Sequence, residues 1–201
     1  AVCVGIIVGV VTLTGVGFRL GFVVIPTAGD ISNFFSNIWP ISFFSFEDLR
    51  LFFSLVLIAI SCIIMGAGIP TTATYIILVA VAAPALAQLG IEPLVAHFFV
   101  FYYGVLADIT PPVALAAYAA SGIAKSNPFK TGNTAFRLGI AKALVPFVFV
   151  YSPSLLLITG EFQTNQLIIT LIGTLIGIAL IGIAFSGYWF RALRKYEQII
   201  I

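Results

Sequence analysis

The chain has 201 residues and a net charge of +2, and 61% of its residues are hydrophobic while only 8% are charged. Soluble domains carry about 25% charged residues, so this chain cannot cover a water-facing surface, and we expect an integral membrane protein in the lipid bilayer. The small net charge gives no indication of a nucleic-acid partner. Without CxxC, HExxH or clustered carboxylates, no metal centre, cofactor or hydrolytic chemistry is indicated.

Apolar runs follow one another along the chain and differ in length. They span residues 1–18, 51–65, 71–89, 93–106, 111–124, 144–159 and 167–190. A spanning helix needs about 20 apolar residues, so the first and last runs are long enough to span, whereas those in the middle are short or broken by Gly and Pro. The first run starts at Ala1 without an initiator Met or a polar beginning, so we expect a fragment of a longer chain.

The charges between the runs predict their orientation. Short loops rich in Lys and Arg stay cytoplasmic, which places both basic stretches, residues 125–142 and 191–195, inside. Links 19–50 and 90–92 are more acidic, and we expect them outside. Within the first link, the phenylalanine-rich segment 31–46 is expected as an amphipathic segment at the outer interface or as a plain loop.

This orientation makes segment 51–89 enter and leave the membrane by the same face. Its break at 66–70 therefore predicts a re-entrant helical hairpin with its tip inside the membrane. Segment 92–124 crosses once and is interrupted at 107–112, which predicts one discontinuous helix. The alternative is an ordinary bundle in which each run spans separately and the Gly and Pro residues are kinks.

Each break frees polar backbone groups. Proline lacks an N–H and disfavours helix at the preceding residue, and glycine permits unusual backbone angles. Exposed backbone groups cost several kcal/mol each in hydrocarbon, so both breaks are expected to face one polar site. Secondary transporters bind Na⁺ with unwound carbonyls and anionic substrate groups at helix N-termini. The candidate ion- and substrate-binding residues are Gly66, Gly68, Pro70, Thr71, Thr72, Ala107, Asp108, Thr110 and Pro111.

Several of these side chains have a second interpretation. The hydroxyls of Thr71, Thr72 and Thr110 could bond back to their own helices. For Asp108, set between apolar runs, we expect one of three roles: cation ligand, proton carrier, or N-terminal cap on a helix that opens at Pro111. The single histidine, His97, is expected near the outer interface rather than in the site.

Three strings carry a family resemblance. They are GAGIPTTATYIILVAVAAPAL from residue 66, AHFFVFYYGVLADITPPVALAAYAASGIAKSNPFKTGNTAFRLG from residue 96, and LVPFVFVYSPSLL from residue 144. They resemble the large, DctM-like membrane subunit of tripartite ATP-independent periplasmic (TRAP) transporters, and are most similar to the fused-permease branch that works with TAXI-type binding proteins. The resemblance covers about residues 1–159, and ITPPVALAAYAA is its most specific part.

The resemblance implies an all-α integral membrane fold with a re-entrant hairpin and a discontinuous helix, as in one inverted repeat of an elevator-type transporter. Residues 1–160 would be the C-terminal repeat of the transport domain, with the hairpin at 51–89 and the broken helix at 92–124. Residues 161–201 would add a transmembrane helix and a basic cytoplasmic end.

The resemblance also implies Na⁺-coupled uptake of a small organic acid across a bacterial or archaeal cytoplasmic (inner) membrane, with Na⁺ as the coupling ion. The partners would be a periplasmic substrate-binding protein and a small membrane subunit or its fused equivalent. Carried over from the family, the Na⁺ ligands would include Gly66, Gly68, Ala107 and Thr110. The family's first motif often ends in aspartate, whereas Gly68-Ile69-Pro70 stands here.

Other functions fit the sequence less well. A membrane scaffold or assembly subunit would contain the same breaks as structural kinks. A channel would need a ring of charged residues, and an enzyme a nucleophile with its base, neither of which the sequence indicates.

Overall fold

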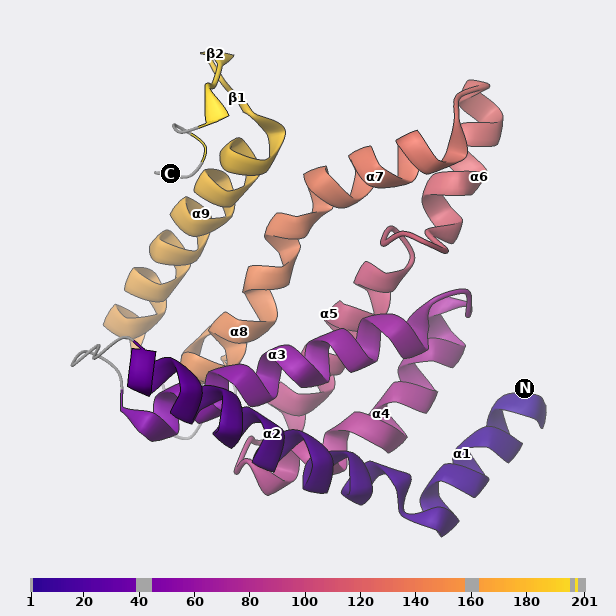
Figure 1. Ribbon diagram of the computed structural model, residues 1–201, viewed down its shortest axis with the longest axis vertical. Coiled ribbons are helices and arrows are strands. Elements are labelled where there is room, and N and C mark those ends of the chain that lie inside the picture. Colours follow the sequence, from indigo (N-terminus) through magenta and orange to yellow (C-terminus); the bar gives the residue numbers. More distant parts are fainter. Residues whose placement is uncertain (1, 39–44, 158–162, 196–197, 199–201) are drawn as a thin grey trace. The chain divides into compact units, whose positions relative to one another are not determined.

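The computed structural model describes residues 2–38, 45–157, 163–195 and 198 (Figure 1). Within these ranges every element is helical except two strands of two residues each, so the predicted all-α membrane fold is confirmed. Among the described residues four helical stretches are long and apolar enough to cross a membrane: Phe46–Gly66, Thr71–Gln88, Pro128–Tyr151 and Thr164–Ser186. The chain forms two compact units, Ala1–Gly104 and Val105–Ile201.

The first unit contains the helices α1 to α4 and most of α5. Their bounds are α1 Val2–Thr14, α2 Val16–Ile38, α3 Phe46–Gly66, α4 Thr71–Gln88 and α5 Pro93–Ala107. Its core is built from aliphatic side chains of α3 and α4 and from α5. Among the fully buried core residues are Leu55, Ile58, Leu78, Leu86, Phe99 and Val100.

The first apolar run does not form a single helix. α1 ends at Thr14, Gly15 takes a φ of +66°, and α2 continues at an angle of 61° to α1. Because a residue with a positive φ cannot continue a right-handed helix, the glycine separates the two.

The link predicted from residue 19 onward is helical as far as Ile38, so the plain-loop alternative is wrong for residues 31–38. The reason is a buried stripe on α2, where Val24, Ala28 and Ser32 recur every four residues and are at most 5% exposed. The Ser32 hydroxyl is satisfied within the helix, because it donates to the Ala28 carbonyl at 2.7 Å. Residues 39–44 of the expected interfacial segment lie outside the described ranges.

Glycines let α2 approach α4 closely. A Cβ on Gly17 would lie 2.7 Å from the Ala80 carbonyl oxygen and 2.9 Å from Cγ of Pro84. One α-helical turn further along, Gly21 faces the side chain of Gln88, which donates to the Phe18 carbonyl at 3.4 Å. The two helices therefore pack backbone to backbone, as small residues allow in membranes.

The second unit continues after α5 with shorter helices. Its elements are α6 Leu115–Ala124, α7 Pro128–Gly139, η1 Ile140–Ala143, α8 Leu144–Tyr151, η2 Pro153–Leu156, α9 Thr164–Ser186, β1 Tyr188–Trp189 and β2 Arg191–Ala192. The strands pair antiparallel and form a two-residue ribbon after α9. The basic stretch 125–142, expected as a loop, is mostly helical, because Asn127 accepts the Lys130 N–H and caps α7.

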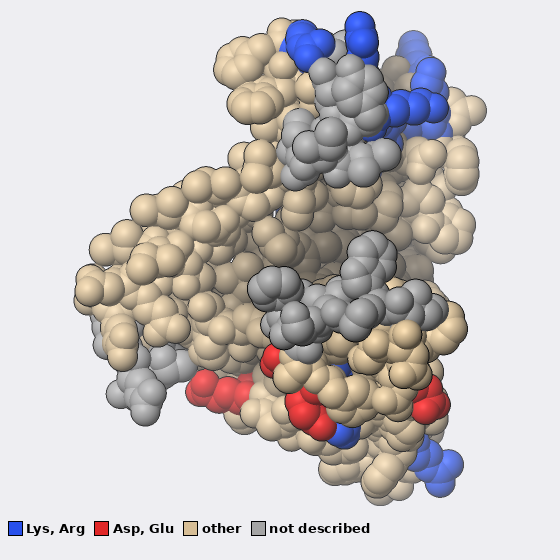
Figure 2. All heavy atoms as spheres, turned by 60° about the vertical axis from the view of Figure 1, so that its left-hand side comes forward, with Lys and Arg blue, Asp and Glu red and all other residues tan. Residues whose placement is uncertain are grey.

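Basic residues dominate the charge of this unit. Within Val105–Ile201 the described charged residues are all basic except Asp108. At the top of the view in Figure 2, blue groups lie near one another with no red among them. Arg137 of α7 donates to the Phe185 carbonyl near the end of α9 at 2.9 Å, which joins the two basic stretches. A cation at a helix C-terminus also interacts favourably with the helix dipole.

Candidate functional site

The first break separates α3 from α4. α3 ends at Gly66, and the Ala67 N–H turns back to the Ile64 carbonyl at 3.4 Å. Gly68 then takes a φ of +83°, a left-handed conformation that costs other residues about 1–2 kcal/mol. Pro70 is the N-cap of α4 and contributes no side-chain hydrogen bond to the helix. The sequence therefore ends one helix and starts the next within four residues, as predicted from Gly68 and Pro70.

Several backbone carbonyls at this break accept no hydrogen bond from the described part of the chain. The Gly66 carbonyl accepts the Ile69 N–H at 3.4 Å. Among the residues that the structure describes, nothing donates to the carbonyls of Met65, Ala67 or Gly68. Free carbonyls of this kind are the oxygen ligands that hard cations prefer.

The N-terminus of α4 is also open. Thr71 and Thr72 are exposed, and within the described ranges neither hydroxyl makes a hydrogen bond. They do not bond back to their helix, and the first N–H groups of α4 have no side-chain cap. Two predicted side chains are thus free to bind a ligand here, next to unpaired carbonyls.

The second break, between α5 and α6, folds back on itself. α5 ends at Ala107, and α6 begins only at Leu115. The Asp108 carbonyl accepts the Ala116 N–H at 3.1 Å, and the Tyr118 hydroxyl donates to the Pro112 carbonyl at 2.6 Å. Backbone groups freed by the prolines are therefore recovered locally.

Asp108 does not act as the predicted helix cap. α6 does not open at Pro111, and its N-cap is Ala114, which makes no side-chain cap bond. The capping interpretation is wrong because residues 111–113 form a turn between Asp108 and the helix. The Asp108 carboxylate is half-buried and has no hydrogen-bond or ion-pair partner among the described residues. Its roles as cation ligand or proton carrier stay predictions.

Thr110 behaves differently from Thr71 and Thr72. Its hydroxyl donates to the Leu106 carbonyl at 2.7 Å, which is the local bond considered as the alternative. The Ala107 carbonyl accepts the Thr110 N–H at 3.2 Å. Each of these oxygens keeps a lone pair, so neither bond prevents a cation from binding.

The helix α7 covers the second break. A Cβ on Gly132 would lie 2.9 Å from the Tyr118 ring and 3.7 Å from Cγ of Pro111, and Gly139 lies against Ile109. Tyr118 and Gly132 therefore pack together at the break, and the role of Gly132 is one that the sequence pattern did not predict. Gly132 and Gly139, seven residues apart on the helix that follows the proline break, are the signal that indicates such close packing.

The two breaks lie in different units of the chain. Gly66, Gly68, Pro70, Thr71 and Thr72 belong to the first unit, and Ala107, Asp108, Thr110 and Pro111 to the second. Each break contains its predicted residues together, whereas the shared polar site stays a prediction.

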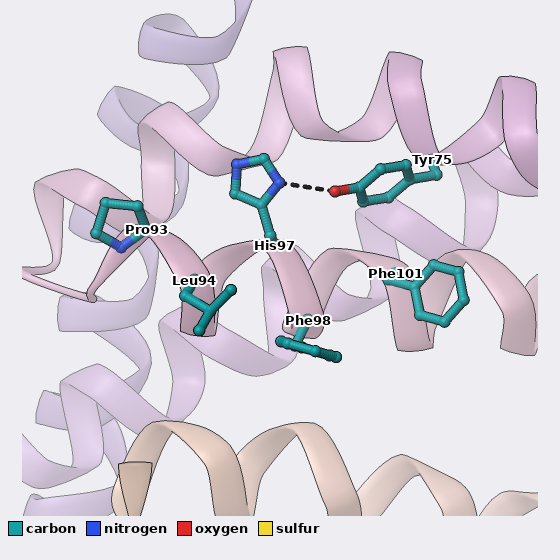
Figure 3. A pocket seen from close by; sticks show the side chains of 6 residues that line it. All are labelled: Tyr75, Pro93, Leu94, His97, Phe98 and Phe101. Atoms are coloured by element: carbon teal, nitrogen blue, oxygen red, sulfur yellow. Dashed lines mark hydrogen bonds between the residues drawn. The ribbon is translucent and has the colours of Figure 1, made fainter. Parts of the chain in front are cut away.

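A separate pocket of about 590 Å³ is lined by residues of α5 and by one residue of α4 (Figure 3). The Tyr75 hydroxyl and Nδ1 of His97 are 2.8 Å apart, and the ring of Phe101 packs edge-on against Tyr75. The pocket is lined by Tyr75, Pro93, Leu94, His97, Phe98 and Phe101. None of these is a predicted site residue, and no group of three metal-ligating side chains occurs in the described part of the chain.

Comparison with known proteins identifies the family. Residues 1–164 match the family model described as the tripartite ATP-independent periplasmic transporter, DctM component. The chain belongs to this family. No curated protein and no solved structure matches it.

Membership agrees with the resemblance seen in the sequence, and DctM chains are components of a transporter rather than of an enzyme. The chain is therefore a multi-pass membrane permease component of a TRAP transporter. The family implies a periplasmic binding protein and a small membrane component, or its fused equivalent, as partners.

Proposed function

We propose that this DctM chain forms part of a Na⁺-coupled permease that takes up a small organic acid, delivered by a periplasmic binding protein, through an elevator movement. The observation that carries the proposal is the break at 67–70, where unpaired carbonyls of Ala67 and Gly68 adjoin the open N-terminus of α4. The carbonyls offer oxygen ligands to a cation, and the helix N-terminus favours an anion. One short segment therefore provides both chemistries that ion-coupled uptake of an organic acid requires.

The segment 51–89 acts in this proposal as a re-entrant hairpin. α3 and α4 pack against each other on either side of the break, and Ser45 and Asp48 form a capping box that fixes the start of α3. In the elevator movement the hairpin tip would travel with the bound ion and substrate. The bacterial or archaeal cytoplasmic membrane is the corresponding location.

A non-transporting scaffold remains the competing function, and two observations favour it. α3 has 21 residues and α4 has 18, so by length each could cross a membrane alone. The Thr110 hydroxyl also bonds back to the last turn of α5, as it would at a simple kink.

Uptake by the complete transporter, reconstituted in proteoliposomes with its binding protein, separates the two functions. Small radiolabelled organic acids are supplied with an inward Na⁺ gradient or with choline in its place. We expect Na⁺-dependent uptake that Thr110→Ala and Pro111→Ala reduce about tenfold or more, because both residues shape the second break. Uptake that is equal in choline, or whose Na⁺ dependence is untouched by both substitutions, would contradict the proposed site.

A further inference from the structure

Thr74, in the first turn of α4, makes a hydrogen bond that differs from those of other threonines in this chain. Its hydroxyl donates to the Ile69 carbonyl, five residues back, at 3.0 Å. Seven other threonines donate to the carbonyl four residues back, which is the ordinary bond within a helix: Thr12, Thr14, Thr27, Thr110, Thr131, Thr134 and Thr174. Thr74 therefore reaches past the start of its own helix into the break.

Two carbonyls of the break depend on this one residue. The Thr74 N–H donates to the Pro70 carbonyl at 2.9 Å, while the Thr74 hydroxyl donates to the Ile69 carbonyl. The peptide groups on both sides of Pro70 are thereby fixed to the first turn of α4. The unpaired carbonyls of Ala67 and Gly68 lie immediately before the group that Thr74 holds.

Packing fixes the direction of the Thr74 hydroxyl. The side chain is 1% exposed. A Cβ on Gly104 of α5 would lie 3.2 Å from the Thr74 methyl carbon, so that methyl group already packs closely against α5. Since the methyl and hydroxyl of threonine share one χ1 angle, a methyl held by α5 directs the hydroxyl towards Ile69.

We propose that Thr74 is a positioning residue for the coupling ion: held by α5 through its methyl, it fixes the Ile69–Pro70 backbone so that the carbonyls of Ala67 and Gly68 stay available as cation ligands. Thr74 itself does not contact the ion. This inference rests on the proposed function, because it assumes that the break binds Na⁺.

Thermal unfolding of the complete purified transporter tests the inference without a known substrate. The melting temperature is followed as NaCl replaces choline chloride at constant ionic strength, since an ion that binds only the folded state raises it. For the wild-type protein we expect a saturable rise. If the melting temperature of the wild-type protein does not rise with NaCl, Na⁺ binding and therefore the proposed function are contradicted, independently of the role of Thr74.

Given that rise, Thr74→Val keeps the shape and the methyl group but removes the hydroxyl. We expect the Na⁺ concentration at half-maximal stabilisation to increase about tenfold, as losing one buried hydrogen bond allows, while the melting temperature in choline falls by only a few degrees. Thr74→Ser keeps the hydroxyl and is expected to bind Na⁺ like the wild type. Thr27→Val, which removes an ordinary bond within α2, is the matched control and leaves Na⁺ binding unchanged.

An unchanged half-maximal concentration in Thr74→Val overturns the inference, and so does an equal increase in Thr74→Ser. If Thr74→Val does not fold, Gly104→Ala decides. Its new methyl would press on the Thr74 methyl at 3.2 Å, so an increase in the half-maximal Na⁺ concentration supports the positioning role. Wild-type Na⁺ binding in folded Gly104→Ala overturns it.

Discussion

At the scale of single residues, the first break depends on backbone angles that few side chains tolerate. Gly68 has a φ of +83°, and Pro70 cannot donate to a preceding carbonyl. Between them they keep the carbonyls of Ala67 and Gly68 out of any helical ladder. In the proposed function, the cation ligands at this break are therefore backbone carbonyls, and Gly68 and Pro70 set their geometry.

Gly68→Ala tests this dependence directly. We expect it to lower stability by about 1–2 kcal/mol, because alanine is strained at a positive φ. For a protein of this size that corresponds to a fall in melting temperature of about 2–8 °C. Gly29→Ala is the control, since Gly29 has no positive φ and a Cβ there would meet nothing within 4 Å. An equal fall in both variants would contradict the backbone interpretation.

At the scale of elements, the two breaks are built in opposite ways. The first leaves carbonyls free and its helix N-terminus uncapped. At the second, the Tyr118 hydroxyl donates to the Pro112 carbonyl and the Ala116 N–H donates to the Asp108 backbone carbonyl. α7 covers the turn, with Gly132 packed against it. The first break is therefore better suited to bind an ion through its backbone. The second offers the Thr110 oxygen and the Asp108 carboxylate, which has no partner among the described residues.

The predicted single crossing by residues 92–124 places the two ends of this segment on opposite faces of the membrane. In a background with Cys3 and Cys62 replaced by alanine, we expect Gly90→Cys to react with a membrane-impermeant maleimide added outside intact cells. Ser126→Cys, beside the basic α7, is expected to react only after the cells are opened, because positively charged loops stay cytoplasmic. Labelling of both positions from one side would contradict the discontinuous helix.

At the scale of the whole molecule, the DctM family places this chain within an assembly. A periplasmic binding protein that delivers the substrate would make uptake depend on two proteins at once. Charge in the described part is distributed unevenly, with basic residues concentrated in Val105–Ile201. This asymmetry is what orients a multi-pass chain in its membrane.

Omitting the binding protein from the reconstituted transporter is expected to reduce uptake to the level of empty vesicles, even with a full Na⁺ gradient. Adding the binding protein back, loaded with substrate, is expected to restore uptake. The measurement is the initial rate of radiolabel accumulation, with an unrelated binding protein as control. Equal rates with and without the cognate binding protein would contradict the delivery step of the proposed function.

Composition and short-range pattern by themselves determined the membrane environment, the helical class and the position of both breaks. These features depend on burial of apolar surface and on the local backbone limits of glycine and proline, which neighbouring residues alone decide. The motif strings also predicted the family that residues 1–164 match.

Tertiary packing decided the rest. The stripe of Val24, Ala28 and Ser32 makes residues 19–38 helical because it has α3 and α4 to pack against. Asp108 caps nothing because Tyr118 and α7 hold the turn after it. Thr74 turns to Ile69 because Gly104 admits α5 against its methyl group. In each case a hydrogen bond or a buried face has a partner distant in the sequence, and local pattern contains no information on which helix supplies it.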